Sequence, residues 1–182
     1  IGKKDRVTAE DVRKIWVRDI KSPGMVSEPF EAQLLAMAKT QIPASDIGRY
    51  CDYAGLVSMS RSCHPIGLIN AGDPAGALQD TFEVGQLYNT AKSRGLRWAA
   101  VTSVAIAAAT RPGATVDSVI GTIFDTCDRG IRPEIERALK LAEKAKDFKE
   151  LRQMFDAVYS GQGIPYSASY ANEVVSKAVA VF

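Results

Sequence analysis

The chain has few of the residue types from which proteins build metal sites and disulfide frameworks. It contains one histidine, His64, and three cysteines, Cys51, Cys63 and Cys127, among 182 residues. A structural zinc site needs closely spaced pairs of Cys or His ligands, and such pairs are absent. An odd number of widely separated cysteines is typical of a reducing compartment rather than of a disulfide framework. We therefore expect a cytoplasmic protein.

Long apolar runs and a strong excess of either charge are also missing. The longest apolar stretch, residues 98–109, is interrupted by Thr102 and Ser103 and is shorter than the about 20 residues that span a bilayer. The 23 basic and 21 acidic residues give a net charge of +2. Because the basic residues are scattered, we expect neither nucleic acid nor a membrane as a partner.

The sequence does contain a succession of helix signals. Thr8 followed by Asp11 has the form of a capping box, and residues 147–150 hold a second. Asp73 before Pro74 predicts a helix that begins at the proline. This position favours Asp73 as a helix N-cap over Asp73 as a catalytic acid.

Residues 96–110 are distinctive because small side chains occupy nearly every face of the predicted helix, among them Ala99, Ser103 and Ala107. A helix that is apolar on nearly all sides is usually buried, and small side chains allow neighbouring helices to approach closely. With roughly eight helical segments and no convincing strand, the pattern predicts an all-α protein. We expect a single domain over residues 1–182.

Prolines and glycines punctuate residues 41–72, where we expect a short helix near residues 45–53 and irregular chain as far as Pro65. Polar residues alternate with Met59 in this stretch, at Ser58, Ser60, Arg61 and Ser62. Hydroxyls and a guanidinium on a loop can bind an anionic ligand. A surface loop with turn-forming serines is the alternative interpretation.

Two residue pairs invite a chemical interpretation. Asp125 and Asp128 are three apart near the end of a predicted helix, where two carboxylates on one face can hold a hard cation. A solvated acidic helix end is the simpler interpretation. Cys63 and His64 are adjacent, and extended neighbours point in opposite directions, so a buried thiol beside a structural imidazole is favoured over a catalytic dyad.

The central part of the chain resembles a known family. Residues 65–74 read PIGLINAGDP, and an alanine-bearing helix follows to Leu87, Tyr88 and Asn89. The small-residue helix and a helix capped by Thr115 come next. This succession resembles the centre of the ADP-ribosylglycohydrolases. The resemblance implies an all-α orthogonal bundle with a binuclear magnesium site, and hydrolysis of the glycosidic bond between ADP-ribose and a protein side chain or a small acceptor.

The resemblance also implies where the ligand binds. The family's central loop reads Gly-Asn-Gly, with Met-Arg a few residues later and then Pro. Here Gly55, Met59 and Arg61 echo that loop with one residue shifted. The ligand-binding residues that the resemblance implies are Asp52, Gly55, Ser58 and Arg61.

The family's two metal-binding motifs are missing, because neither Thr-Asp-Asp nor Asp-x-Asp-Thr occurs in the chain. The resemblance therefore implies magnesium (Mg²⁺) held by carboxylates outside this sequence. The start at Ile1 and the apolar, uncapped finish at Phe182 lead us to expect a segment of a longer enzyme. The first alternative is a catalytically inactive helical relative with a binding or structural role. The second is an unrelated helical interaction module.

Overall fold

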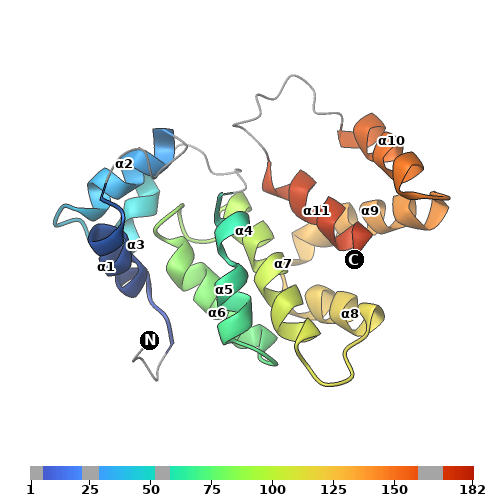
Figure 1. Cartoon of the computed structure of the whole chain (residues 1–182), viewed down its shortest axis with the longest axis horizontal. Helices are drawn as coiled ribbons and strands as arrows, with labels where there is room; N and C mark the ends of the chain where they lie inside the picture. Colours follow the sequence, from blue (N-terminus) through green and yellow to red (C-terminus); the bar gives the residue numbers. More distant parts are fainter. Residues whose placement is uncertain (1–5, 22–28, 52–57, 160–169) are drawn as a thin grey trace.

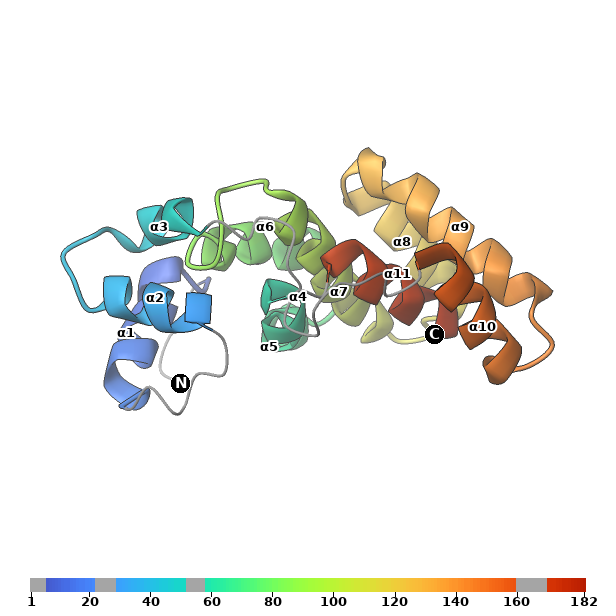
Figure 2. The ribbon, with the colours of Figure 1, turned by 90° about the horizontal axis from the view of Figure 1, so that it is seen from above.

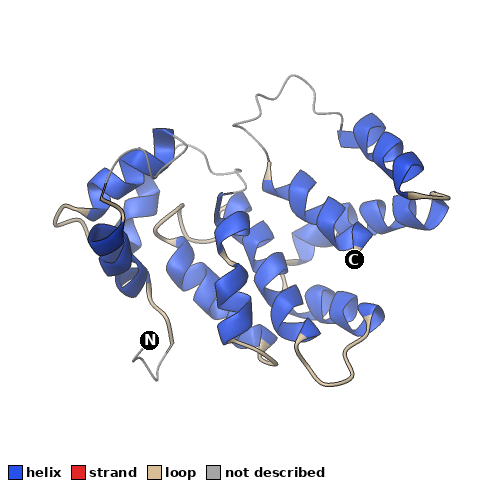
Figure 3. Cartoon of the chain, in the orientation of Figure 1, coloured by secondary structure: helices blue, strands red, loops and turns tan. Residues whose placement is uncertain are grey.

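The computed structural model describes residues 6–21, 29–51, 58–159 and 170–182. All of the elements in these ranges are helices (Figure 3), which confirms the predicted all-α class. Their bounds are α1 (Ala9–Asp19), α2 (Pro29–Ala38), α3 (Ala44–Ile47), α4 (Ser58–Ser62), α5 (His64–Ile69), α6 (Pro74–Gly85), α7 (Arg94–Ala109), α8 (Val116–Thr126), α9 (Arg132–Lys144), α10 (Phe148–Tyr159) and α11 (Ala171–Val181), with short 3₁₀ helices η2 (Gly48–Tyr50) and η3 (Arg129–Ile131).

The helices form an elongated row (Figures 1 and 2). Helices α1–α3 lie at one end, α4–α7 occupy the middle, and α8–α11 lie at the other end. No helix in the described ranges combines the length and the apolarity needed to cross a bilayer.

The helix-start signals in the sequence form the caps that they predict. The Thr8 hydroxyl accepts from the Asp11 amide and the Asp11 carboxylate accepts from the Thr8 amide, which completes a capping box. The Asp73 carboxylate accepts a hydrogen bond from the Gly76 amide at 2.9 Å, which confirms that Asp73 is an N-cap. At the second predicted box the Asp147 carboxylate accepts from the Glu150 amide at 2.9 Å, while the Glu150 carboxylate accepts from the Lys146 amide at 2.8 Å rather than from Asp147.

The small-residue helix α7 is the centre of the packing. It contacts α4, α5, α6, α8 and α11. One side of it, at Leu96 and Ala99, belongs to a core shared with α4, α5 and α6. Another side, at Trp98, Val101 and Val104, belongs to a core shared with α8, α9 and α11. Both sides of α7 are therefore buried, as its composition predicts.

A third core lies at the far end of the row. It joins α1, α2 and α3 and includes Leu87, just after α6. Each of the three cores has its own set of buried side chains, so the two ends of the molecule are linked through α6 and α7 rather than directly.

Residues 41–65 only partly follow the prediction. Helices α3 and η2 confirm the short helix near residues 45–53. The irregular chain expected up to Pro65 is wrong, because residues 58–62 form α4 and α5 begins at His64. The reason is a helical spacing of apolar side chains that the serines obscure. These side chains, which pack into the core beneath α4 and α5, are Met59, Cys63 and Ile66.

Gly67 allows α5 to pack closely against α7. A Cβ atom at this position would lie 2.6 Å from the Ile106 Cβ and 2.9 Å from the Ser103 carbonyl oxygen. Gly121 in α8 differs, because a Cβ there would meet nothing within 4 Å. The two glycines form a matched pair for measuring how much the close approach matters.

We expect Gly67→Ala to lower the free energy of unfolding by about 1–3 kcal/mol through overpacking. We expect Gly121→Ala to raise it by about 0.5–1 kcal/mol, because alanine is the better helix former. Denaturant unfolding followed by circular dichroism measures both. Equal effects of the two substitutions would contradict the close contact between α5 and α7.

Candidate functional site

The four residues expected to bind a ligand are only partly visible. Asp52 and Gly55 lie outside the described residues, and Ser58 is the first residue of α4. Arg61 lies on the same helix and is exposed. Arg61 is thus the one expected contact whose side chain the structure places, and it is available to a ligand in solution.

A buried series of hydrogen-bonded polar groups supports the junction between α4 and α5. The Thr81 hydroxyl donates to the Ser103 hydroxyl at 2.8 Å, and Ser103 donates to the Cys63 carbonyl oxygen at 3.4 Å. The Cys63 thiol donates to the carbonyl oxygens of Ser60 and Ala99, each at 3.4 Å. These bonds tie the backbone that carries Arg61 to helices α6 and α7.

Cys63 and His64 do not form a dyad, in agreement with the sequence interpretation. The Cys63 side chain is fully buried, and burial raises the pKa of its thiol from 9.0 to about 11. His64 is exposed, and its Nδ1 lies 2.9 Å from the Arg61 carbonyl oxygen. Burial likewise raises the pKa of Cys127 to about 12, so neither thiol is an activated nucleophile.

A cavity lined by two aromatic rings lies between α1, α2 and the segment that follows α6. Trp16 and Tyr88 meet edge to face with ring centroids 5.1 Å apart. They line a cavity of about 170 Å³ that also includes Glu31. Burial raises the pKa of the Tyr88 phenol, and a hydrogen bond with Ser62 of α4 acts in the opposite direction. The aromatic pair and the helix that bears Arg61 are therefore neighbours.

A second polar network includes Asn70, from the segment that carries the family resemblance. The Arg6 Nε donates to Asp80 Oδ1 at 2.8 Å, and the Asn70 amide donates to Asp80 Oδ2 at 2.8 Å. The Asp80 side chain is 4% exposed, whereas Arg6 is 40% exposed. The network fastens the segment before α1 to the start of α6, so its role in this structure is positional.

The pair Asp125 and Asp128 does not share a helix face, which corrects the expectation from sequence. Helix α8 ends at Thr126, and Asp128 lies beyond the C-cap. The Asp128 carboxylate instead caps η3 by accepting from the Gly130 amide at 2.8 Å. Its other oxygen lies 3.6 Å from Arg97. The chain turns sharply between the two carboxylates, which explains why counting residues failed.

The described residues do not fit the magnesium site that the resemblance implies. Within residues 6–21, 29–51, 58–159 and 170–182, no group of three or more His, Cys, Asp or Glu side chains is placed to hold a metal ion. A binuclear magnesium site needs several carboxylates around two ions.

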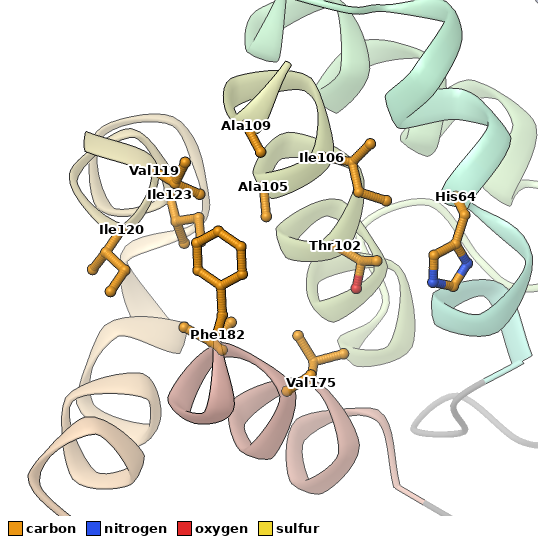
Figure 4. A pocket seen from close by; sticks show the side chains of 12 residues that line it. His64, Thr102, Ala105, Ile106, Ala109, Val119, Ile120, Ile123, Val175 and Phe182 are labelled. Carbon is orange, nitrogen blue, oxygen red and sulfur yellow. The ribbon is translucent and has the colours of Figure 1, made fainter. Parts of the chain in front are cut away.

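Sequence reasoning missed an apolar groove between four helices (Figure 4). It has a volume of about 210 Å³ and is lined by His64 of α5, by one face of α7, and by residues of α8 and α11. The residues come from distant parts of the chain, so local patterns do not reveal it. The signal in the sequence is the apolar character of the last helix, whose Ala178 and Val179 form one wall.

No family model, curated protein or solved structure matches this chain. The resemblance to ADP-ribosylglycohydrolases therefore rests on the order of residues from 65 to 89 and on the helices that follow.

Asp80 is buried whereas Arg6 is partly exposed, so we expect the two substitutions of this ion pair to differ in their effect on stability. Arg6→Met leaves a buried carboxylate with one remaining donor, and we expect a loss of about 2–3 kcal/mol in the free energy of unfolding. Asp80→Asn leaves Arg6 able to turn toward water, and we expect a loss of about 1 kcal/mol. Arg18→Met, in an exposed pair with Asp19, serves as the control and should leave stability almost unchanged, because exposed ion pairs contribute little. A larger loss for Asp80→Asn than for Arg6→Met would refute this account.

The raised thiol pKa values predict that stability falls as pH rises above about 9. Unfolded thiols ionise near that pH, whereas folded Cys63 and Cys127 keep their protons up to about 11 and about 12. The unfolded state then binds fewer protons than the folded state, so the free energy of unfolding decreases with pH. Each thiol contributes at most about 1.4 kcal/mol per pH unit. Urea unfolding from pH 8 to 10.5 measures the slope, which should be shallower in the Cys63→Ala/Cys127→Ala variant. The same slope in both proteins would show that the thiols are not its source.

Proposed function

We propose that this protein acts on ribosyl glycosides as a hydrolase of the ADP-ribosylglycohydrolase type. The observation that carries the proposal is the sequence PIGLINAGDP at residues 65–74, which begins four positions after the exposed Arg61. The substrate would be an ADP-ribosylated or ribosylated protein or small molecule. The orthogonal bundle of that family would be the fold to which these helices belong.

The geometry around α4 supports a binding role for this part of the chain. A guanidinium presents five donors in a planar fork that suits phosphate oxygens. Arg61 carries such a group on a helix whose backbone is tied to α6 and α7 through Cys63. The neighbouring pair Trp16 and Tyr88 is partly buried and lines a cavity of about 170 Å³, and aromatic rings of this kind can stack on a nucleobase. These residues therefore have the groups needed to bind a diphosphate and a nucleobase.

The role assigned to the described residues is to bind and orient the substrate. Hydrolysis of a glycosidic bond also needs carboxylates, to activate water directly or to hold magnesium. In this proposal the carboxylates that hold magnesium lie outside this sequence.

A catalytically inactive helical relative is the second candidate. The observation that favours it is the lack of a metal-binding group of carboxylates in the parts of the chain that the structure describes. Such a protein would recognise the same ligand through Arg61 without turning it over. Binding and turnover therefore separate the two candidates.

We expect ADP-ribose to bind the purified protein, as measured by isothermal titration calorimetry. Arg61→Ala should weaken the binding about tenfold or more, because a hydrogen bond to a charged group contributes about 1.5–3 kcal/mol. Arg152→Ala is the matched control, since Arg152 is 83% exposed and lies on α10. It should leave the affinity unchanged.

Release of ADP-ribose from an ADP-ribosylated protein by the full-length protein, which would include the carboxylates outside this sequence, decides between the candidates when it is measured with Mg²⁺ and with a chelator. Turnover that requires Mg²⁺ supports the hydrolase. Binding without turnover supports the inactive relative. If ADP-ribose does not bind at all, both candidates are wrong.

A further inference from the structure

The groove between α5, α7, α8 and α11 differs in chemistry from the surface around Arg61. Its walls are almost entirely aliphatic and lie on four separate helices (Figure 4). Val119, Ile123 and Val175 are buried at its base, while Ala109 and Phe182 are exposed at its rim. The groove is open to solvent at the rim and closed by packed side chains beneath.

His64 places a hydrogen-bonding group at one end of this apolar groove. A backbone carbonyl oxygen can only accept a hydrogen bond, so the contact of 2.9 Å with Arg61 requires the hydrogen to be on Nδ1. In the neutral imidazole, Nε2 is then an acceptor. Figure 4 shows one ring nitrogen on the groove side of the imidazole. The end of the groove therefore offers a hydrogen-bond acceptor beside an aliphatic surface.

The size of the groove sets the size of its occupant. An aliphatic cavity of about 150 Å³ in another protein holds benzene. The groove here, at about 210 Å³, has room for a single ring with a small substituent. Binding sites for small molecules typically combine apolar walls with a few placed polar groups.

We infer that the groove is a binding site for a small apolar molecule that carries one O–H or N–H donor, with the donor directed to Nε2 of His64. A phenol is the simplest such ligand. The ring would lie against the aliphatic side chains of α7, α8 and α11, and its hydroxyl would donate to the imidazole. This site is distinct from the ribosyl ligand of the proposed function and does not depend on it.

Phenol and toluene are suitable probes because they have nearly the same shape and differ in the donor. Their binding is measured from the methyl signals of Ile106, Val119 and Val175 in ¹H–¹³C NMR spectra, which also locate the ligand. We expect phenol to bind with a Kd on the order of 1 mM, as befits a ligand of seven heavy atoms.

Removing the imidazole tests the hydrogen bond. In His64→Leu, the ratio of the toluene Kd to the phenol Kd should fall by about fivefold to tenfold, because only phenol loses a partner. A ratio equal to that of the unsubstituted protein would overturn the role of His64.

Filling the groove tests its location. Ala109→Leu places a larger side chain at the exposed rim, and it should abolish the methyl shifts for both probes below about 5 mM ligand. Ala32→Leu, at an exposed position of α2, is the matched control and should bind both probes normally. Unchanged binding in Ala109→Leu, or no binding by the unsubstituted protein, would overturn the site.

The remaining outcomes are also decisive. If the methyl signals shift with protein concentration and phenol does not reverse the shift, a second copy of the chain occupies the groove and the inference is wrong. Arg61→Ala should leave phenol binding unchanged, which separates this site from the proposed ribosyl site. The result for phenol binding therefore does not depend on the result of the ADP-ribose experiment.

Discussion

Helix α7 lies close to its neighbours in the middle of the row, and this close packing positions the helices around it. Small side chains at positions such as Ala99, Ser103 and Ala107 let α7 contact five other helices. Close contact also prevents larger side chains at those positions, because the space that they would need is already filled by a neighbouring helix. The missing side chain of Gly67 on α5 belongs to the same constraint. The orientation of α4 and α5, and hence of Arg61 and His64, follows from it.

The Arg61 residue takes part in two different surfaces. Its guanidinium is exposed and available to an anion, while its carbonyl oxygen sets the tautomer of His64 beside the apolar groove. The short junction between α4 and α5 thus presents both a guanidinium and an imidazole at the surface. Support for this junction comes from the buried hydroxyls of Thr81 and Ser103, which satisfy one another in the core. Buried polar groups of this kind fix a geometry because any other arrangement leaves them unpaired.

Local signals in the sequence predicted the local structure well. The caps at Thr8, Asp73 and residues 147–150 depend on only three or four consecutive residues, and all are present. Prediction failed where packing decided the local structure. The serines of α4 predicted a loop, but residues 58–62 form a helix because Met59 and the adjoining Cys63 are buried in the core. The groove could not be predicted, since its walls come from residues 64–182 and meet only in the fold. Counting residues from Asp125 to Asp128 also failed, because a turn intervenes.

The division into three cores has a consequence for how the molecule opens. Helices α1–α3 are joined to the rest by links that include Leu87, the Trp16–Tyr88 ring contact, the ion pair between Arg6 and Asp80 and a hydrogen bond from the Gly48 amide to the Gln86 carbonyl oxygen. Because these links join two separate cores, one end can open as a unit while the opposite end stays intact. Amide hydrogens in α1–α3 would then exchange with solvent together, ahead of those in α7. A ligand that bridged α4 and the aromatic pair would slow this exchange, because it would add a further link across the boundary.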